Sequence, residues 1–117
     1  MLSLPPSVRI FLCLEPADMR RSFDGLFMMS EKIARQNPFS GHLFVFANKR
    51  KDRLKVLYWD RDGFAIWYKR LEEGTFSFEE VGSGGVEIEA FRLSLLLGGI
   101  DLGRARKRRR YSRRIDP

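Results

Sequence analysis

The sequence is poor in the residue types that build metal sites, disulfides and membrane anchors. Its 117 residues include one cysteine, Cys13, and one histidine, His42, so an internal disulfide and a paired-histidine zinc site are both excluded. Cys13 lies in an apolar run, which favours a buried free thiol in a reducing cytosol. No apolar stretch approaches the roughly 18 residues of a membrane span. The N-terminus is short and broken by proline, so we expect no signal peptide.

The motifs of common active sites are also missing. The segment 40–42 does not form a nucleophile elbow, and the glycines of 82–85 lack the lysine and helix that follow a phosphate-binding loop. The paired acids Asp60 and Asp62 fall in a turn, where aspartate is favoured for local hydrogen bonding. We therefore expect no catalytic residue, no metal and no cofactor. We expect His42 to be a strand residue with a hydrogen-bonded ring.

Positive charge is concentrated at the C-terminal end. Residues 103–117 contain eight Lys and Arg residues and one Asp, which gives this segment a charge of +7. The whole chain also carries +7, so residues 1–102 are neutral overall. We expect 1–102 to form a single domain and 103–117 to be a disordered tail. Such a tail binds phosphate backbones with little sequence preference and with a strong dependence on salt.

Hydrophobic patterning predicts an α+β domain with a mainly antiparallel sheet of four to six strands. Strands are expected at 8–14, 42–47, 53–60, 64–71 and 86–89, with 75–78 as a short additional candidate. Helical spacing predicts one long helix that begins at Ser22 or Asp24, after a separate turn at 18–21, and stops at Asn37-Pro38. A shorter C-terminal helix is expected over 90–97, capped by Gly98 or Gly99.

Residues 39–71 alternate aromatic runs with clusters of Lys and Arg. A three-residue loop with Gly63 in the left-handed conformation would pair Asp60 with Phe64. In that register an apolar face packs on the long helix and consists of Leu54, Val56, Tyr58, Phe64, Ile66 and Tyr68. The other face carries Arg53, Lys55, Leu57, Trp59, Trp67 and Lys69.

This register places Lys55 directly opposite Lys69, and like charges in that position are destabilising unless they serve an anion. Trp59 and Trp67 beside them would offer stacking surfaces, worth ~1–3 kcal/mol per base in single-strand binders. The alternative is that both tryptophans pack on the second helix while the lysines extend to solvent. A slip of one residue would also exchange the two faces.

Three segments carry a resemblance to a known family. DMRRSFDGL (18–26), NPFSGHLFVFANKRKDRLKVLYWDRDGFAIWYKRLEEGTF (37–76) and LSLLLGGID (93–101) resemble the TnpB accessory protein of insertion sequence family sixty-six. This is not the RNA-guided nuclease that shares the name TnpB. The chain departs from the family pattern at Glu89-Ala90, where the last helix usually opens with Thr-Pro or Ser-Pro. It departs again at Leu102, where the family usually has Trp.

The resemblance implies a bacterial mobile element in which the protein acts beside a TnpA and a TnpC transposase, without an active site of its own. The residues themselves point to a cytoplasmic, non-catalytic protein that binds DNA on the nucleoid. The expected contacts are Lys49, Arg50, Lys51, Arg53, Lys55, Trp59, Trp67, Lys69, Arg70, Arg106, Lys107, Arg108, Arg109 and Arg110. The alternative is an adaptor that docks on the transposase without touching DNA, through a tryptophan face. A divergent nuclease is a third, weaker hypothesis.

Overall fold

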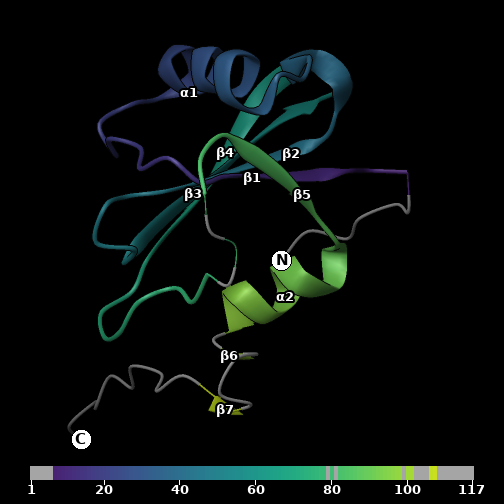
Figure 1. Ribbon diagram of the computed structural model, residues 1–117. Coiled ribbons are helices and arrows are strands. Elements are labelled where there is room, and N and C mark those ends of the chain that lie inside the picture. Colours follow the sequence, from purple (N-terminus) through teal and green to yellow (C-terminus); the bar gives the residue numbers. More distant parts are fainter. Residues whose placement is uncertain (1–6, 79, 81, 99, 102–105, 108–117) are drawn as a thin grey trace, which may run out of the picture.

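The computed structural model describes residues 7–78, 80, 82–98, 100–101 and 106–107. Five strands form one sheet in the order β4-β3-β2-β1-β5, with helix α1 on one face and helix α2 on the other (Figure 1). The strands are β1 (Ile10–Cys13), β2 (Leu43–Ala47), β3 (Arg53–Asp60), β4 (Gly63–Arg70) and β5 (Gly85–Ile88). The α+β class and the helix pair expected from the sequence are confirmed.

The sheet is mixed, because β1 and β2 run parallel while the three other neighbouring pairs are antiparallel. The parallel pair follows from the chain between them: parallel strands need a long crossover, and here the crossover contains α1. Every residue of β1 and of β2 is buried. This explains why both segments are apolar on both faces, as central strands covered on two sides must be.

Helix α1 spans Phe23–Met29 and continues as a π-helical turn over Ser30–Ala34. The hydrogen bond from Arg21 N to Asp18 O closes a separate turn before it, as predicted. The buried Ser30 hydroxyl donates to Leu26 O at 2.9 Å, which satisfies it inside the helix. Arg35 ends the helix in the left-handed conformation, with φ at 54°, two residues before the predicted stop at Asn37-Pro38. Pro38–Ser40 then forms one 3₁₀ turn.

The core has two halves, one on each side of the sheet. Between the sheet and α1, Leu26 meets Phe44 and Phe46 of β2 and Leu57 of β3, all buried. On the opposite side, α2 (Ala90–Gly98) buries Leu93, Leu96 and Leu97 against the alternate residues of the same strands. Because side chains alternate across a strand, successive residues of β2 belong to opposite halves: Leu43 and Val45 face α2, and Phe44 and Phe46 face α1.

The segment 75–78 is not a strand, contrary to the prediction. Phe76 is buried against the α2 side of the sheet, and its N–H donates to Lys51 O at 2.7 Å. The segment is therefore held by the turn after β2. Its apolar residues fill the core without joining the ladder.

Past α2, Ile100–Asp101 (β6) pairs antiparallel with Arg106–Lys107 (β7) in a separate two-stranded sheet. Two residues of the predicted tail are thus in a strand. Arg108, Arg109 and Arg110 lie outside the described residues.

The predicted register of the β3–β4 hairpin is wrong by one residue. Asp60 pairs with Gly63, and the loop is the two-residue Arg61-Asp62. Arg61 takes the left-handed position, with φ at 59°, and Gly63 does not. A loop that is shorter by one residue shifts every pair along the hairpin, so the β4 residues share a face with the other set of β3 residues. Phe64 and Ile66 pack on the α1 side as predicted, whereas Leu54, Val56 and Tyr58 lie on the α2 side.

Candidate nucleic-acid interface

The observed register separates the residues that were expected to share one face. Lys55 lies opposite Tyr68, and Leu54 lies opposite Lys69, so the predicted opposition of Lys55 and Lys69 does not occur. Trp59 pairs with Phe64 on the α1 side, whereas Trp67 pairs with Val56 and packs on the α2 side. The two tryptophans therefore cannot form a single stacking surface.

Lys55 is buried, with 7% of its surface exposed. Its ammonium donates to the carbonyl oxygens of Met19 and Arg21, both at 2.8 Å, and lies 4.7 Å from the centre of the Tyr68 ring. These contacts satisfy a buried cation inside the fold. In this geometry Lys55 fastens the 19–21 segment to the sheet.

Lys69 turns toward the other helix. Its ammonium lies 3.4 Å from Leu97 O, close to the C-terminus of α2, where the helix dipole favours a positive charge. Trp67 is partly buried against the α2 half of the core. This matches the packing alternative for Trp67, and the lysine beside it folds onto the helix end.

Trp59 belongs to an aromatic cluster, which consists of Phe27, Phe39, Trp59 and Phe64. The rings meet edge to face or tilted, with centroids 5.1–5.6 Å apart. Phe39 lies at its centre, touches the other three rings, and is still 52% exposed. This cluster sits near the end of the hairpin that carries the Arg61-Asp62 loop.

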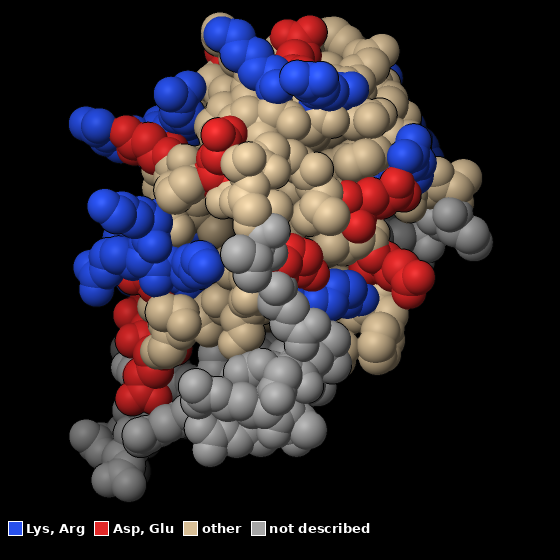
Figure 2. Space-filling model, in the orientation of Figure 1, with Lys and Arg blue, Asp and Glu red and all other residues tan. Residues whose placement is uncertain are grey.

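The opposite end of the hairpin carries the cations that the structure brings together. This basic end consists of Lys49, Arg50, Lys51, Arg53 and Arg70. A hydrogen bond from Leu71 N to Asp52 O, 2.7 Å long, holds the end of β4 beside the turn. Figure 2 shows Lys and Arg side chains gathered at the left, over the place where Figure 1 has the turn between β2 and β3.

Asn48 shapes this turn. Its side-chain oxygen accepts hydrogen bonds from the backbone N–H groups of Asp52 and Arg53, and its amide donates to Asp52 Oδ1 at 2.6 Å. Asparagine is favoured in turns because it can bond the backbone this way. The bond from Asn48, with the nearby Arg50, lowers the pKa of the Asp52 carboxyl. The turn therefore holds Lys49 and Arg50 outward on a rigid frame.

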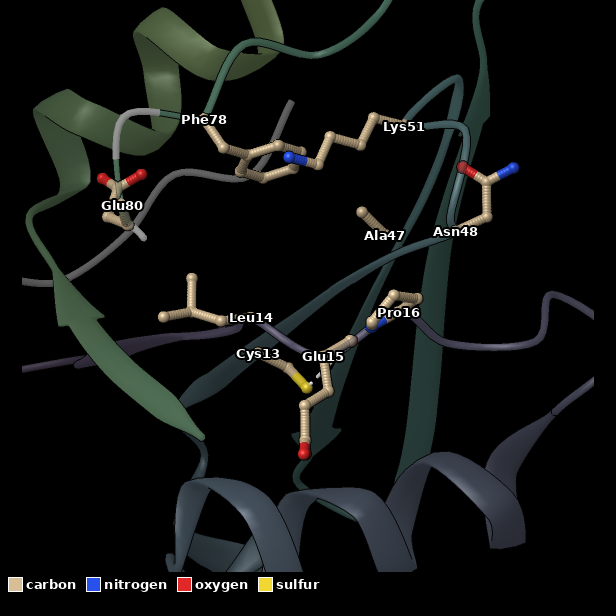
Figure 3. Close-up of a pocket in the computed structure, with 9 residues that line it drawn as sticks. All are labelled: Cys13, Leu14, Glu15, Pro16, Ala47, Asn48, Lys51, Phe78 and Glu80. Carbon is tan, nitrogen blue, oxygen red and sulfur yellow. Dashed lines mark hydrogen bonds between the residues drawn. The ribbon is translucent and has the colours of Figure 1, made fainter. Parts of the chain in front are cut away.

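Lys51 behaves differently from its neighbours. It has a positive φ of 60°, and its ammonium lies 5.2 Å from the centre of the Phe78 ring (Figure 3). Both residues line a pocket of about 40 Å³ that also touches Cys13 and Glu80. Ligand pockets of proteins usually hold ~300–1,000 Å³. This one is too small for a nucleotide base.

Arg53 and Arg70 lie directly opposite each other, as the last pair of the hairpin. With Tyr68 and Glu72 they line an open hollow of about 400 Å³. Glu72 Oε1 lies 2.8 Å from Arg70 Nη2, and this bond raises the pKa of Arg70. Arg53 Nη1 donates to the Tyr68 hydroxyl at 3.2 Å. Two guanidinium groups held this way offer several N–H donors to one anion.

Tyr68 is the residue of this surface that the sequence interpretation missed, since it was assigned to the face packed on the long helix. It is 45% exposed and stands between Lys55 and Arg53. A two-residue loop of Arg61-Asp62, with Gly63 as the first residue of β4, would have predicted the observed register.

Similar proteins place the chain in a family. The family described as IS66 Orf2-like protein matches residues 8–107. Protein y4jC of Sinorhizobium fredii (strain NBRC 101917 / NGR234) is 34% identical over 108 residues, which cover 92% of each chain. Protein y4hO of the same strain is 35% identical over 101 residues, covering 86% of this chain and 88% of its own. No solved structure gives a significant match. The chain belongs to the IS66 Orf2-like family, whose members are accessory proteins associated with transposition.

Proposed function

We propose that this protein binds DNA, without catalysis, through its basic end and assists transposition of its element from there. The observation that carries the proposal is the Arg53–Arg70 pair. Two arginines stand directly opposite each other, a position that is unfavourable without an anion to share. Lys49 and Arg50 extend the same surface, and both are exposed.

The chemistry of the hollow fits a phosphodiester. Guanidinium groups bind phosphate oxygens in a bidentate fashion, and the exposed face of Tyr68 can stack on a base or a sugar beside it. Asp52 and Glu72 offset two of the five positive charges, so the basic end is moderate in strength. Contacts of this kind go to the backbone, so we expect weak dependence on DNA sequence.

The arginine-rich C-terminus is the second part of the proposal. Arg106, Lys107, Arg108, Arg109 and Arg110 would add phosphate contacts without a defined geometry. The protein would then work in the bacterial cytoplasm, on the nucleoid, beside the transposase of its element. Deleting 103–117 should reduce the salt dependence of binding and leave the contacts of the basic end in place.

The test is a salt titration of binding to duplex and single-stranded DNA, measured by fluorescence anisotropy. An Arg53→Gln/Arg70→Gln variant is compared with Arg9→Gln/Arg20→Gln, which removes two ion-paired surface arginines elsewhere. Each lost phosphate contact lowers the slope of log K against log salt by about 1, so the first variant should lose about 2. The control should keep the slope of the native chain.

Two results would overturn this proposal. One is the absence of binding at low salt. The other is an equal loss in both double variants, which would mean that only net charge matters.

The exposed ring of Phe39 favours a second candidate, a docking site for a protein of the same element. Aromatic residues at the centre of a cluster with exposed edges are common anchors of protein interfaces. The test is co-purification with the transposase and its companion proteins after nuclease treatment, using Phe39→Ser and the basic-end variant in parallel. Loss of the complex only in Phe39→Ser supports docking. A complex that survives Phe39→Ser, or that disappears with nuclease, contradicts it.

A further inference from the structure

We infer that β4 is a self-association edge, at which a second copy of this chain adds its own β4 in antiparallel orientation. The inference does not rest on DNA binding, although Tyr68 and Arg70 also line the proposed DNA-binding hollow. It starts from the position of β4, which closes one side of the sheet. Within the part of the chain that the structure describes, no strand pairs with its outer side.

This edge lacks the usual protection against pairing. Natural edge strands are kept apart by shortness, proline, bulges or charges along their length. The other edge, β5, has four residues and carries Glu87, which is ion-paired with Arg9. Strand β4 has eight residues, and five consecutive ones, 64–68, are Phe-Ala-Ile-Trp-Tyr, without charge or proline. Lys69 places its ammonium near Leu97 O on α2, away from the centre of the strand.

Symmetry restricts the registers that a second copy can adopt. A two-fold axis perpendicular to the sheet keeps the same face up in both copies, so directly opposite residues must come from the same face. Even-numbered residues of β4 can then oppose only even-numbered ones. The axis must then run between the two strands, midway between one residue and its own copy, and the two central choices for that residue are Ile66 and Trp67.

Side-chain complementarity selects the register centred on Ile66. It places Phe64 opposite Tyr68 of the second copy, an aromatic pair of the kind that stabilises antiparallel strands. It sets the small Ala65 opposite the large Trp67. It also brings Asp62 opposite Arg70, and symmetry makes this pairing occur twice. The register centred on Trp67 instead puts Phe64 opposite Arg70 and Asp62 opposite Glu72, two acids.

Exposure fits this assignment. Tyr68 is 45% exposed on the edge strand, and Asp62 is exposed in the loop. Arg70 already touches Glu72 at 2.8 Å, and an arginine has donors enough for a second carboxylate. The two sheets would join into one of ten strands, with both copies of α1 on the same side.

The experiment measures the oligomeric state of the full chain by sedimentation in buffer free of nucleic acid. The native chain should show a concentration-dependent dimer. Asp62→Arg should weaken the dimer, because an arginine then lies opposite Arg70 at both symmetric places. Arg70→Asp should weaken it in the same way, because an aspartate then lies opposite Asp62. Each should raise the dimer dissociation constant by roughly tenfold or more.

The double variant Asp62→Arg/Arg70→Asp exchanges the charges and should restore the dimer. Both positions are exposed, and circular dichroism checks that each variant is folded. A chain that stays monomeric at every concentration overturns the inference. So does a dimer whose dissociation constant is unchanged in both single variants. Failure of the double variant to recover also overturns it. Because Asp62→Arg leaves Arg53 and Arg70 in place, loss of the dimer can be told apart from loss of DNA binding.

Discussion

The ammonium of Lys55 donates a 2.8 Å hydrogen bond to the carbonyl oxygen of Met19, a residue 36 positions earlier in the chain. A second bond to Arg21 O makes the same side chain bridge the sheet and the segment before α1. A lysine in a basic-aromatic block would be expected to meet an external anion. Here two backbone carbonyls and the Tyr68 ring surround it.

Replacing Lys55 tests this structural role. Lys55→Met keeps the length of the side chain but leaves the two carbonyls without their donor, so the free energy of unfolding should fall by about 1–3 kcal/mol. Lys49→Met, in the exposed turn, should change it by no more than about 0.5 kcal/mol. Urea denaturation measures both. An unchanged stability in Lys55→Met, together with a loss of DNA affinity, would contradict the structural role and indicate that Lys55 contacts DNA.

The hairpin loop offers a test of the register. Arg61 has φ at 59°, a conformation that costs a residue with a side chain roughly 1–2 kcal/mol and glycine almost nothing. Glycine relieves this strain but loses more conformational entropy on folding than arginine does. The net effect of Arg61→Gly should be a rise in the free energy of unfolding of up to about 1 kcal/mol. Asp62→Gly should give no gain, because its φ is not positive. Thermal melts of both variants and of the native chain measure these changes in stability. A gain at Asp62 and a loss at Arg61 would contradict the two-residue loop.

The close approach of β5 to the end of the long helix predicts that Gly85 tolerates no side chain. A Cβ at Gly85 would lie 2.8 Å from Ala34 Cα, which is backbone and cannot swing away. Gly85→Ala should therefore destabilise the fold by about 1–3 kcal/mol. Gly98→Ala is the matched control, since no atom outside its helix lies within 4 Å of that Cβ. Equal melting temperatures for the two variants would rule out this packing.

The single histidine makes stability depend on pH. Arg9 N–H donates to His42 Nδ1 at 2.9 Å, which requires that nitrogen to be unprotonated. Burial, and then the charge of Arg9, lower the pKa of His42 below its ordinary 6.5. The unfolded chain binds the proton more readily, so this stabilisation is complete above about pH 6.5 and is lost as the pH falls toward the folded pKa.

His42→Asn keeps an acceptor near the Nδ1 position and cannot titrate, so it should flatten the pH dependence of unfolding in that window. The measurement is a series of urea midpoints across the window, supported by an NMR titration of the His42 ring in the folded chain. If the midpoint of the native chain rises as the pH falls below 6.5, the sign of this linkage is wrong.

Much of the sheet could be predicted because strand periodicity is a local property. The pattern RLKVLYWD gave the bounds of β3 as the structure has them, and the separate turn at 18–21 followed from Gly25 inside the helical run. The register could not be predicted in the same way. It depends on one loop residue, and the presence of Gly63 favoured the longer loop, although Arg61 accepted the strained position.

That single residue decided the predicted surface. In the observed register Trp67 packs under α2 while Trp59 lies on the α1 side, so the two tryptophans part. Arg53 pairs with Arg70, where the predicted register would have paired it with Leu71, and Tyr68 stands beside both arginines. The role of Phe76 was also beyond local patterning, because its partner is the turn at Lys51. The basic turn itself was predictable from composition, since Asn48 and Asp52 are favoured turn residues.

The place of β1 in the sheet has a consequence for how the chain is made. Ile10 pairs with Leu43 of β2 on one side and with Ile88 of β5 on the other. Both edges of β1 can therefore be paired only after β5 has been synthesised. Such distant pairings slow folding, and during synthesis an apolar strand remains open on one side. Translation products that stop before Gly85 would keep that edge exposed, and they are expected to aggregate before a protease removes them.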